Sequence, residues 1–229
     1  MSGWHRRQVV FSGVIVRRVT LVSFIGCVLA GCGSEPPPVN LRQPETIAVE
    51  GSYVHPVSGM TFPVAVGEFR RVNLIRYDAA GADVSVGYNL GGPTGGVVAT
   101  VYVYPASSLG AIDAKQDAAP ARVALCGNEF QGRKAEIFRY HRGVRVVDEK
   151  DVPITFAGTS MTGRMAAFAY DDVFGGRLQP LQSELYIFCY VGDAWTIAYR
   201  FTAPREFDAT RAIAAFMLNL SWTISSSAR

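Results

Sequence analysis

The stretch LYIFCYVGDAWTIAYRFT, residues 185–202, decides the fold of this chain. Apolar and aromatic residues fill two runs, Leu185–Val191 and Ala194–Thr202, which the dipeptide Gly192-Asp193 separates. Gly and Asp tolerate the positive φ angles of a tight turn. The pattern therefore predicts a β-hairpin whose turn has two residues.

A two-residue turn fixes which side chains share each face of this hairpin. One face then carries the larger rings and chains, namely Tyr186, Phe188, Tyr190, Trp195, Ile197 and Tyr199. The other face carries Leu185, Ile187, Cys189, Thr196, Ala198 and Arg200. Because both faces are largely apolar, we expect both to be covered.

Further strands are predicted on either side by two-residue alternation between glycines and prolines. They are Phe69–Tyr77, Val84–Tyr88, Val97–Tyr104, Val144–Phe156 and Met161–Tyr170. The glycine-rich segment 91–96 joins two of them into another hairpin. It is not expected to bind phosphate, because a phosphate loop opens a helix and here a strand follows.

Two segments have helical character. The C-terminal one, Asp208–Leu220, has an apolar stripe of helical period after Pro204, and Asp208 can cap its start. The other, Ala119–Arg142, is less regular. The order of strands, helix, strands and helix predicts an α+β domain in which helices pack on an antiparallel sheet.

Residues 1–31 have the pattern of an export signal. Arg17 and Arg18 precede the apolar run Val19–Ala30, which has the length of a signal-peptide core and is too short to span a bilayer. The run ends in Leu29-Ala30-Gly31-Cys32, which resembles the lipobox of bacterial lipoproteins. The resemblance implies cleavage before Cys32, a diacylglycerol on that cysteine, and a mature protein anchored to a membrane and facing the periplasm.

Other readings of this segment stay open. Cys27 would leave a shorter apolar run and is a poorer lipid site, and the signal could instead be cleaved elsewhere or remain as an anchor. The pair Arg6-Arg7 could indicate twin-arginine export, although it lies far from the apolar run. No Asp follows Cys32, which by analogy with enterobacterial sorting favours the outer membrane.

The charge of the chain excludes some partners. Its formal net charge is +3, but four of the 22 Lys and Arg and none of the 19 Asp and Glu lie in residues 1–31. The remainder is near neutral and shows no Lys/Arg stripe, so nucleic acid is not an expected partner.

The chain divides into four parts. Residues 1–31 are the signal peptide, and residues 32–47 comprise the lipidated cysteine and a tether rich in proline, which holds a chain extended. Residues 48–224 are long enough for a single α+β domain, and residues 225–229 form a flexible tail.

The last part of the domain resembles a PsbP-like domain in layout. A long hairpin, Glu184–Ala203, leads into a helix, Asp208–Leu220, and Ser58–Phe69 matches an early segment that runs into the first strand. No diagnostic motif supports the resemblance. It implies an accessory subunit, a role that such domains commonly have.

Two cysteines remain besides Cys32. In an oxidising envelope, Cys126 and Cys189 predict one disulfide, which would tie the middle helix to the central hairpin. The alternative is two buried thiols. The spacing is not Cys-x-x-Cys, so a redox role is not expected.

The residues give little support for an enzyme. His55 and His141 lie far apart without a metal-binding pattern, and no Gly-x-Ser-x-Gly motif is present. We therefore predict no catalytic residues, no metal and no cofactor. Acidic residues at positions that look like loops are interpreted as solvated turn residues: Asp148, Glu149, Asp151, Asp171 and Asp172.

Three functions remain. The first is a non-enzymatic envelope lipoprotein that binds a protein partner. The second is a small-molecule or lipid-binding module whose pocket is lined by Tyr186, Tyr190, Trp195 and Tyr199, although a hydrophobic core also explains these aromatics. The third is a hydrolase with an unfamiliar site, which would require an acid within hydrogen-bonding reach of His55 or His141.

Overall fold

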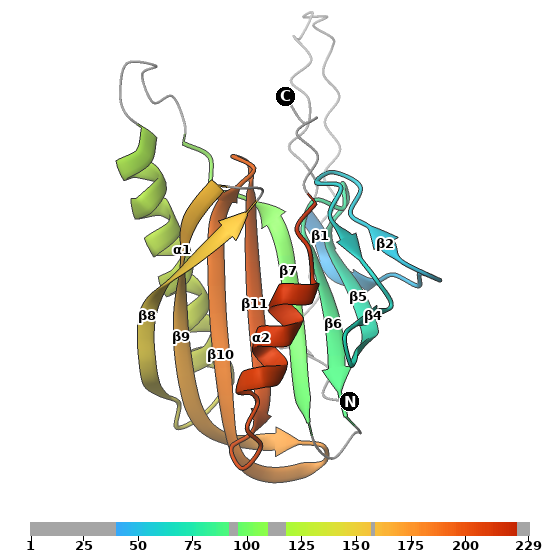
Figure 1. The fold of residues 1–229 in the computed structure, drawn as a ribbon, viewed down its shortest axis with the longest axis vertical. Helices are drawn as coiled ribbons and strands as arrows, with labels where there is room; N and C mark the ends of the chain where they lie inside the picture. Colours follow the sequence, from blue (N-terminus) through green and yellow to red (C-terminus); the bar gives the residue numbers. More distant parts are fainter. Residues whose placement is uncertain (1–39, 92–95, 110–117, 157–158, 224–229) are drawn as a thin grey trace, which may run out of the picture.

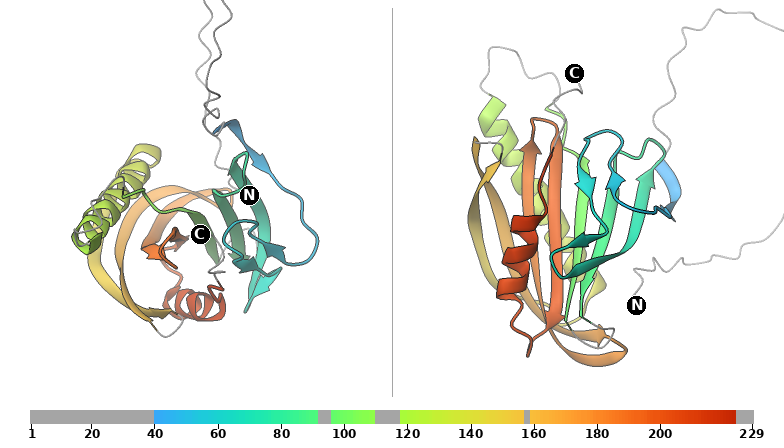
Figure 2. Two further views of the ribbon diagram at one scale, coloured as in Figure 1. Left: turned by 90° about the horizontal axis from the view of Figure 1, so that it is seen from above. Right: turned by 45° about the vertical axis from the view of Figure 1, so that its right-hand side comes forward.

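The computed structural model of the chain describes residues 40–91, 96–109, 118–156 and 159–223. An antiparallel sheet curls around one helix and carries a longer helix on its outer side (Figure 1). The view from above in Figure 2 shows the shorter helix inside the curl and the longer helix outside it. This is the predicted α+β arrangement, with the sheet as the dominant part.

The N-terminal half of the domain contains strands alone among its described elements. They are β1 (Asn40–Thr46), β2 (Tyr53–Val54), β3 (Thr61–Phe62), β4 (Ala65–Val66), β5 (Phe69–Asp78), β6 (Val84–Leu90) and β7 (Val97–Pro105). The predicted strands of this half are confirmed. Of the connecting segment 91–96, residues 92–95 lie outside the described residues.

The C-terminal half begins and ends with a helix. Its elements are α1 (Ala118–Tyr140), β8 (Arg145–Phe156), β9 (Thr159–Phe174), β10 (Arg177–Val191), β11 (Trp195–Pro204) and α2 (Thr210–Asn219). Both predicted helices are confirmed within two residues. The main sheet has the order β1-β5-β6-β7-β11-β10-β9-β8, with β4 also paired to β5, while β2 and β3 form a separate pair.

The predicted register of the central hairpin is confirmed over most of its length. Tyr186 pairs with Tyr199 and Phe188 pairs with Ile197. The predicted two-residue turn is wrong, because Val191 rather than Tyr190 pairs with Trp195. The register shifts at Tyr190, whose φ of 57° is left-handed, and this β-bulge takes Tyr190 out of the pairing with Trp195.

Each face of the hairpin is buried against a different helix. The inner face contributes Trp195, Ile197, Tyr199 and Phe201, which cluster with Ile213, Phe216 and Leu220 at α2. The outer face contributes Leu185, Ile187 and Ala198, which cluster with Phe130 and Ile137 of α1. The sheet thus separates two cores.

The predicted start of α2 needs a small correction. Ala209 occupies the cap position and makes no side-chain cap bond. The carboxylate of Asp208 still accepts a hydrogen bond from the backbone N–H of Thr210, at 3.1 Å. Asp208, one residue before the cap position, therefore accepts a hydrogen bond from one of the free amides at the start of the helix.

The predicted tether is too long. Asn40–Thr46 lies within it but forms β1, which pairs with β5. An ion pair of 2.5 Å between Glu45 and Arg76 joins the two strands. The sequence shows no alternation of apolar and polar residues here, because β1 is an edge strand that is joined to β5 by backbone hydrogen bonds. None of the described helices is long and apolar enough to cross a membrane.

A single glycine lets the neighbouring strands β9 and β10 approach. A Cβ atom added to Gly163 of β9 would lie 2.3 Å from the ring of Phe188 and 2.7 Å from the carbonyl oxygen of Ile187. Both lie on β10, and Phe188 is fully buried. The inner core therefore requires glycine at this position.

We predict that Gly163→Ala lowers the free energy of unfolding by about 1–3 kcal/mol, as overpacking does elsewhere. The matched control is Gly127→Ala in α1, where an added Cβ meets nothing within 4 Å. That control should stabilise the protein by about 0.5–1 kcal/mol, because alanine favours the helix. Urea unfolding of both variants decides the matter, and equal stability of the two would contradict this packing.

Candidate functional site: the polar network beneath the long helix

Helix α1 is attached to the sheet by few apolar contacts. Only Phe130 and Ile137 are buried among its residues. A helix of about 34 Å needs other attachments to stay on the sheet, and α1 has them at its start, middle and end.

The start of α1 is held by a disulfide. Cys126 and Cys189 of β10 are bonded, with their Cα atoms 5.8 Å apart. Cys189 lies on the outer face, as its place in the hairpin predicts. Nearby, Arg122 forms a 2.8 Å ion pair with Asp193 and stacks over the ring of Tyr190. The bulged turn therefore also contacts α1.

We predict that Cys126→Ser with Cys189→Ser lowers the free energy of unfolding by about 2–4 kcal/mol, because the bond closes a long loop. In the wild-type protein, thiol labelling after unfolding without reductant should modify neither residue. Labelling of both cysteines would show that the pair is not bonded. An unchanged urea midpoint in the double variant would show that the bond does not stabilise the protein.

The middle of α1 is held by charged and polar contacts. Tyr104 donates a 2.7 Å hydrogen bond to Glu129, which also accepts one from Arg133 at 2.9 Å. Lys134 pairs with Glu149 of β8. Glu149 therefore lies under the helix, so its predicted place in a turn is wrong.

The end of α1 leads into a buried network. Asp172 Oδ2 lies 2.5 Å from His141 Nδ1, and His141 Nε2 lies 2.9 Å from Arg200 Nη2. Arg200 also donates to the hydroxyl of Tyr170 at 3.0 Å and to that of Ser183 at 3.3 Å. The ring of Tyr170 stacks on His141 with centroids 4.4 Å apart. Asp148, Asp151 and Asp171 also lie in strands, not in turns as predicted.

The partners of His141 fix its tautomer. A guanidinium can only donate hydrogen bonds, so Nε2 must accept from Arg200. Nδ1 therefore carries the proton and donates it to Asp172. A neutral imidazole thus connects a buried cation, Arg200 at 7% exposure, to a carboxylate nearer the solvent.

Burial lowers the pKa of His141, and the neighbouring Arg200 lowers it further, while Asp172 acts in the opposite direction. A histidine whose folded pKa lies below 6.5 binds fewer protons when folded than when unfolded. Its contribution to stability is therefore complete above that value and is lost as the pH falls through the folded pKa.

We predict that His141→Gln removes part of this pH dependence. The amide of glutamine can donate to Asp172 and accept from Arg200, but it does not titrate. The variant should match the wild type near about pH 8 and lose less stability toward about pH 5.

The pH profile of the variant must be compared with that of the wild type, because other groups with shifted pKa values contribute equally to both profiles. Burial also lowers the pKa of His55, and burial raises that of Asp83 to about 6, which has the opposite effect on stability. Identical pH profiles for the variant and the wild type would contradict the assigned role of His141.

The hydrolase hypothesis required an acid within hydrogen-bonding reach of His55 or His141, and Asp172 meets this requirement at His141. A general base also needs a free nitrogen that can accept the proton of a nucleophile. Arg200 occupies Nε2, and the hydroxyl of Ser183 donates to the carbonyl of Phe201 at 2.8 Å. This arrangement fixes α1 to the sheet and offers no general base.

The structure does not bring the four predicted pocket aromatics into one cavity. Trp195 and Tyr199 lie in the inner core, where Tyr199 stacks between Phe201 and Trp222. Tyr186 is partly buried and donates to Glu184 at 2.6 Å, while Tyr190 faces α1 and donates to the carbonyl of Ser107.

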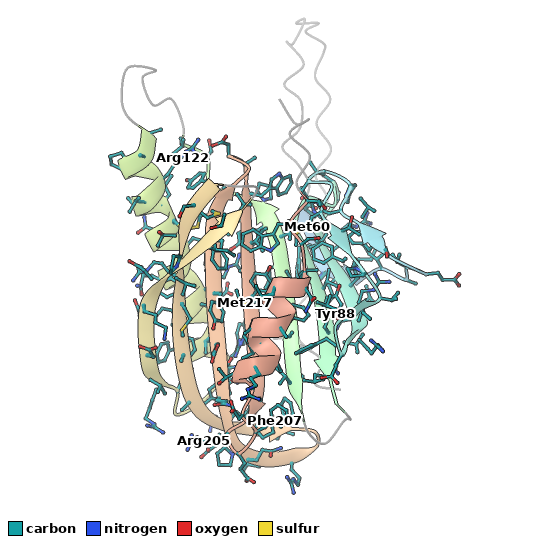
Figure 3. All side chains as sticks on the ribbon, in the orientation of Figure 1. Met60, Tyr88, Arg122, Arg205, Phe207 and Met217 are labelled. Atoms are coloured by element: carbon teal, nitrogen blue, oxygen red, sulfur yellow. A yellow bond between two sulfur atoms is a disulfide. The ribbon has the colours of Figure 1, made fainter. Side chains whose placement is uncertain are left out.

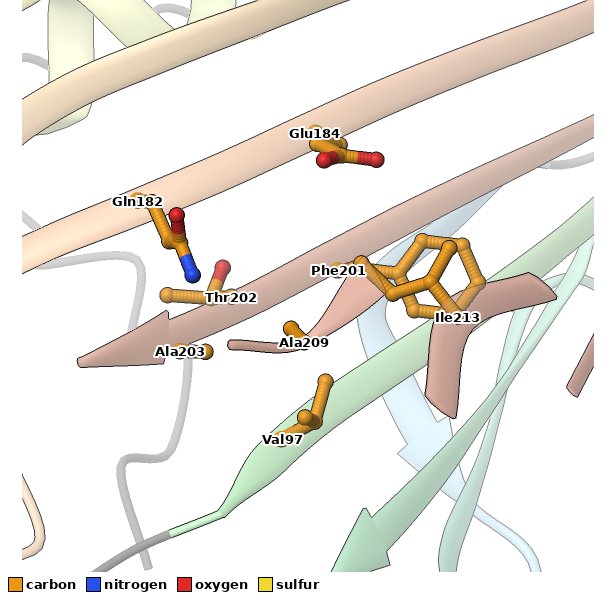
Figure 4. Close-up of a pocket in the computed structure, with 8 residues that line it drawn as sticks. All are labelled: Val97, Gln182, Glu184, Phe201, Thr202, Ala203, Ala209 and Ile213. Carbon is orange, nitrogen blue, oxygen red and sulfur yellow. The ribbon is translucent and has the colours of Figure 1, made fainter. Parts of the chain in front are cut away.

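A shallow hollow lies at the start of α2 (Figure 4). Its lining includes Gln182, Phe201, Ala209 and Ile213. Its volume of about 10 Å³ leaves room for about one water molecule at most. This hollow is far smaller than the pockets that hold metabolites or lipids.

Two further residues were singled out from the sequence, Cys32 and His55, and neither takes part in this network. Cys32 lies outside the described residues. His55 is fully buried, accepts a hydrogen bond from the amide of Ser58 at 2.9 Å, and packs edge-on against Trp195. Within the described ranges, no group of His, Cys, Asp and Glu could hold a metal ion.

No protein-family model matches this chain, and no curated protein matches it.

Proposed function

We propose that this protein is a non-enzymatic lipoprotein of the bacterial cell envelope that binds a protein partner through the surface formed by α1 and β8. The observation that carries the proposal is the number of large apolar side chains that these two adjoining elements expose. They are Val123, Phe138, Tyr140, Val146 and Val147. Four of them fall within residues 138–147, and exposed apolar residues that lie close together favour a binding site for another protein.

The position of the predicted lipid supports a domain that stands away from the membrane with the surface of α1 and β8 accessible to a partner. Strand β1 begins at Asn40, next to Asp78 of β5 and only a short way after Cys32. Seven residues at about 3.1 Å each would let the domain stand about 22 Å from the lipid. The membrane in question would be the outer membrane, and the surface formed by α1 and β8 would face the periplasm.

The layout of the domain is consistent with an accessory role. The β10–β11 hairpin leads directly into α2, as in the PsbP-like domains that this part of the sequence resembles. Such domains commonly serve as accessory subunits, although a fold alone does not define a function.

Replacing Cys32 with Ser tests the anchor. We predict that wild-type protein sediments with membranes and that Cys32→Ser appears in the soluble fraction or as an unprocessed precursor. One lipid-modified terminus with two or more acyl chains explains a stable attachment. Acylated protein on the membrane in the variant would overturn the assignment.

Photocrosslinking in cells tests the binding surface. A photoreactive residue at Val123 or Val147 of the tagged, anchored protein should capture one dominant envelope protein. The same residue at Val54 or Leu218, which are exposed at 57% and 85% on other elements, should capture none. Capture only at the control positions would contradict the proposal, and a bound lipid or metabolite without a protein would favour a small-molecule carrier.

A further inference from the structure

Three arginines and four large apolar residues lie within residues 138–147, where α1 ends and β8 begins. This surface, the arginine corner, consists of Phe138, Arg139, Tyr140, Arg142, Arg145, Val146 and Val147. All seven are exposed, and Phe138, Tyr140 and Val147 are exposed at 46%, 50% and 63%. The segment 137–147 contains no acidic residue and no lysine.

None of the three arginines of the arginine corner forms an ion pair within the described part of the domain. Ion pairs there involve the other cations of α1, β8 and β9, which are Arg122, Arg133, Lys134, Lys150 and Arg164. No described carboxylate lies within 4 Å of Arg139, Arg142 or Arg145. The helix dipole accounts for Arg139 in the last turn of α1, but not for the other two.

We propose that the arginine corner docks an acidic surface of a partner protein. This inference rests on the proposed protein-binding function and names the chemistry of the partner. Arginine and aromatic residues dominate binding energy at protein interfaces, and a guanidinium can bind a carboxylate through two hydrogen bonds. Three arginines without lysine fall short of the polybasic clusters that recognise anionic membranes.

The location of the corner agrees with a protein partner. Arg122 at the start of α1 pairs with Asp193, in the turn before Trp195. The sheet register places that turn at the same end as Asn40. The corner lies about 26 Å from Arg122 along α1, so it is distant from the predicted lipid. Figure 3 shows Arg122 near the upper end of the domain and Arg205 with Phe207 at the opposite end.

The test uses a photoreactive residue at Tyr140 of the full-length, anchored protein in cells. In one variant Arg139, Arg142 and Arg145 are changed to Glu. In the matched control Arg177, Arg205 and Arg211 are changed to Glu, which gives the same change in charge at exposed positions of β10, of α2 and of the segment between β11 and α2. Thermal unfolding of both variants should match that of the wild type.

We expect the corner variant to reduce crosslinking about tenfold or more and the control to leave it nearly unchanged. The crosslinked partner peptide should be rich in Asp and Glu, and changing those acids to Arg should restore crosslinking to the corner variant. Crosslinking that survives reversal of the corner, or a captured peptide without acidic residues, overturns the inference.

Two further measurements separate possible failures. If Val123 captures the same protein in the corner variant and in the wild type, the protein-binding function stands and only the acidic docking fails. If purified wild-type protein binds vesicles of phosphatidylethanolamine and phosphatidylglycerol through Tyr140 and no protein is captured, the corner is a lipid contact and the inference is wrong.

Discussion

The burial of the β10–β11 hairpin on both faces is the constraint on which the rest of the structure depends. Its inner face packs against α2 and its outer face against α1, so two helices that never meet are positioned by one pair of strands. Phe188 can fill the inner core only because Gly163 lets β9 and β10 approach closely. The hairpin thus sets the positions of α1 and α2 relative to each other, because each helix packs against one of its two faces.

The two helices are held by different physical means. Apolar packing secures α2, through Ile213, Phe216 and Leu220. In α1 only Phe130 and Ile137 are buried. A disulfide near its start, polar contacts and an ion pair in its middle, and the Asp172–His141–Arg200 chain at its end complete the attachment. Such fixing keeps most of the helix surface exposed, which suits a helix that binds a partner. The buried guanidinium of Arg200 makes this attachment depend on the protonation of His141.

The sequence predicted those parts of the fold that follow from local patterns. Two-residue alternation located the hairpin, and a stripe of helical period located α2. The disulfide pairing followed from a count of two cysteines. The bulge at Tyr190 and the edge strand β1 could not be predicted, because both depend on backbone pairing. The network at His141 joins the residue that follows α1 to residues of β9, β10 and β11. The one signal for it was Arg200, a single charge on an otherwise apolar strand face. The arginine corner was also overlooked, because its charges are few in number and only the structure shows that they lack acidic partners.

The central claim is that the surface formed by α1 and β8 binds a protein. Hydrogen–deuterium exchange tests it directly, by comparing the anchored protein isolated gently with its associated proteins and the same protein after those are removed. The account predicts slower exchange of backbone amides over residues 138–152 in the associated state, with little change in β5, β6 and α2. Protection confined to α2 and the inner face, or no difference between the two states, would contradict it.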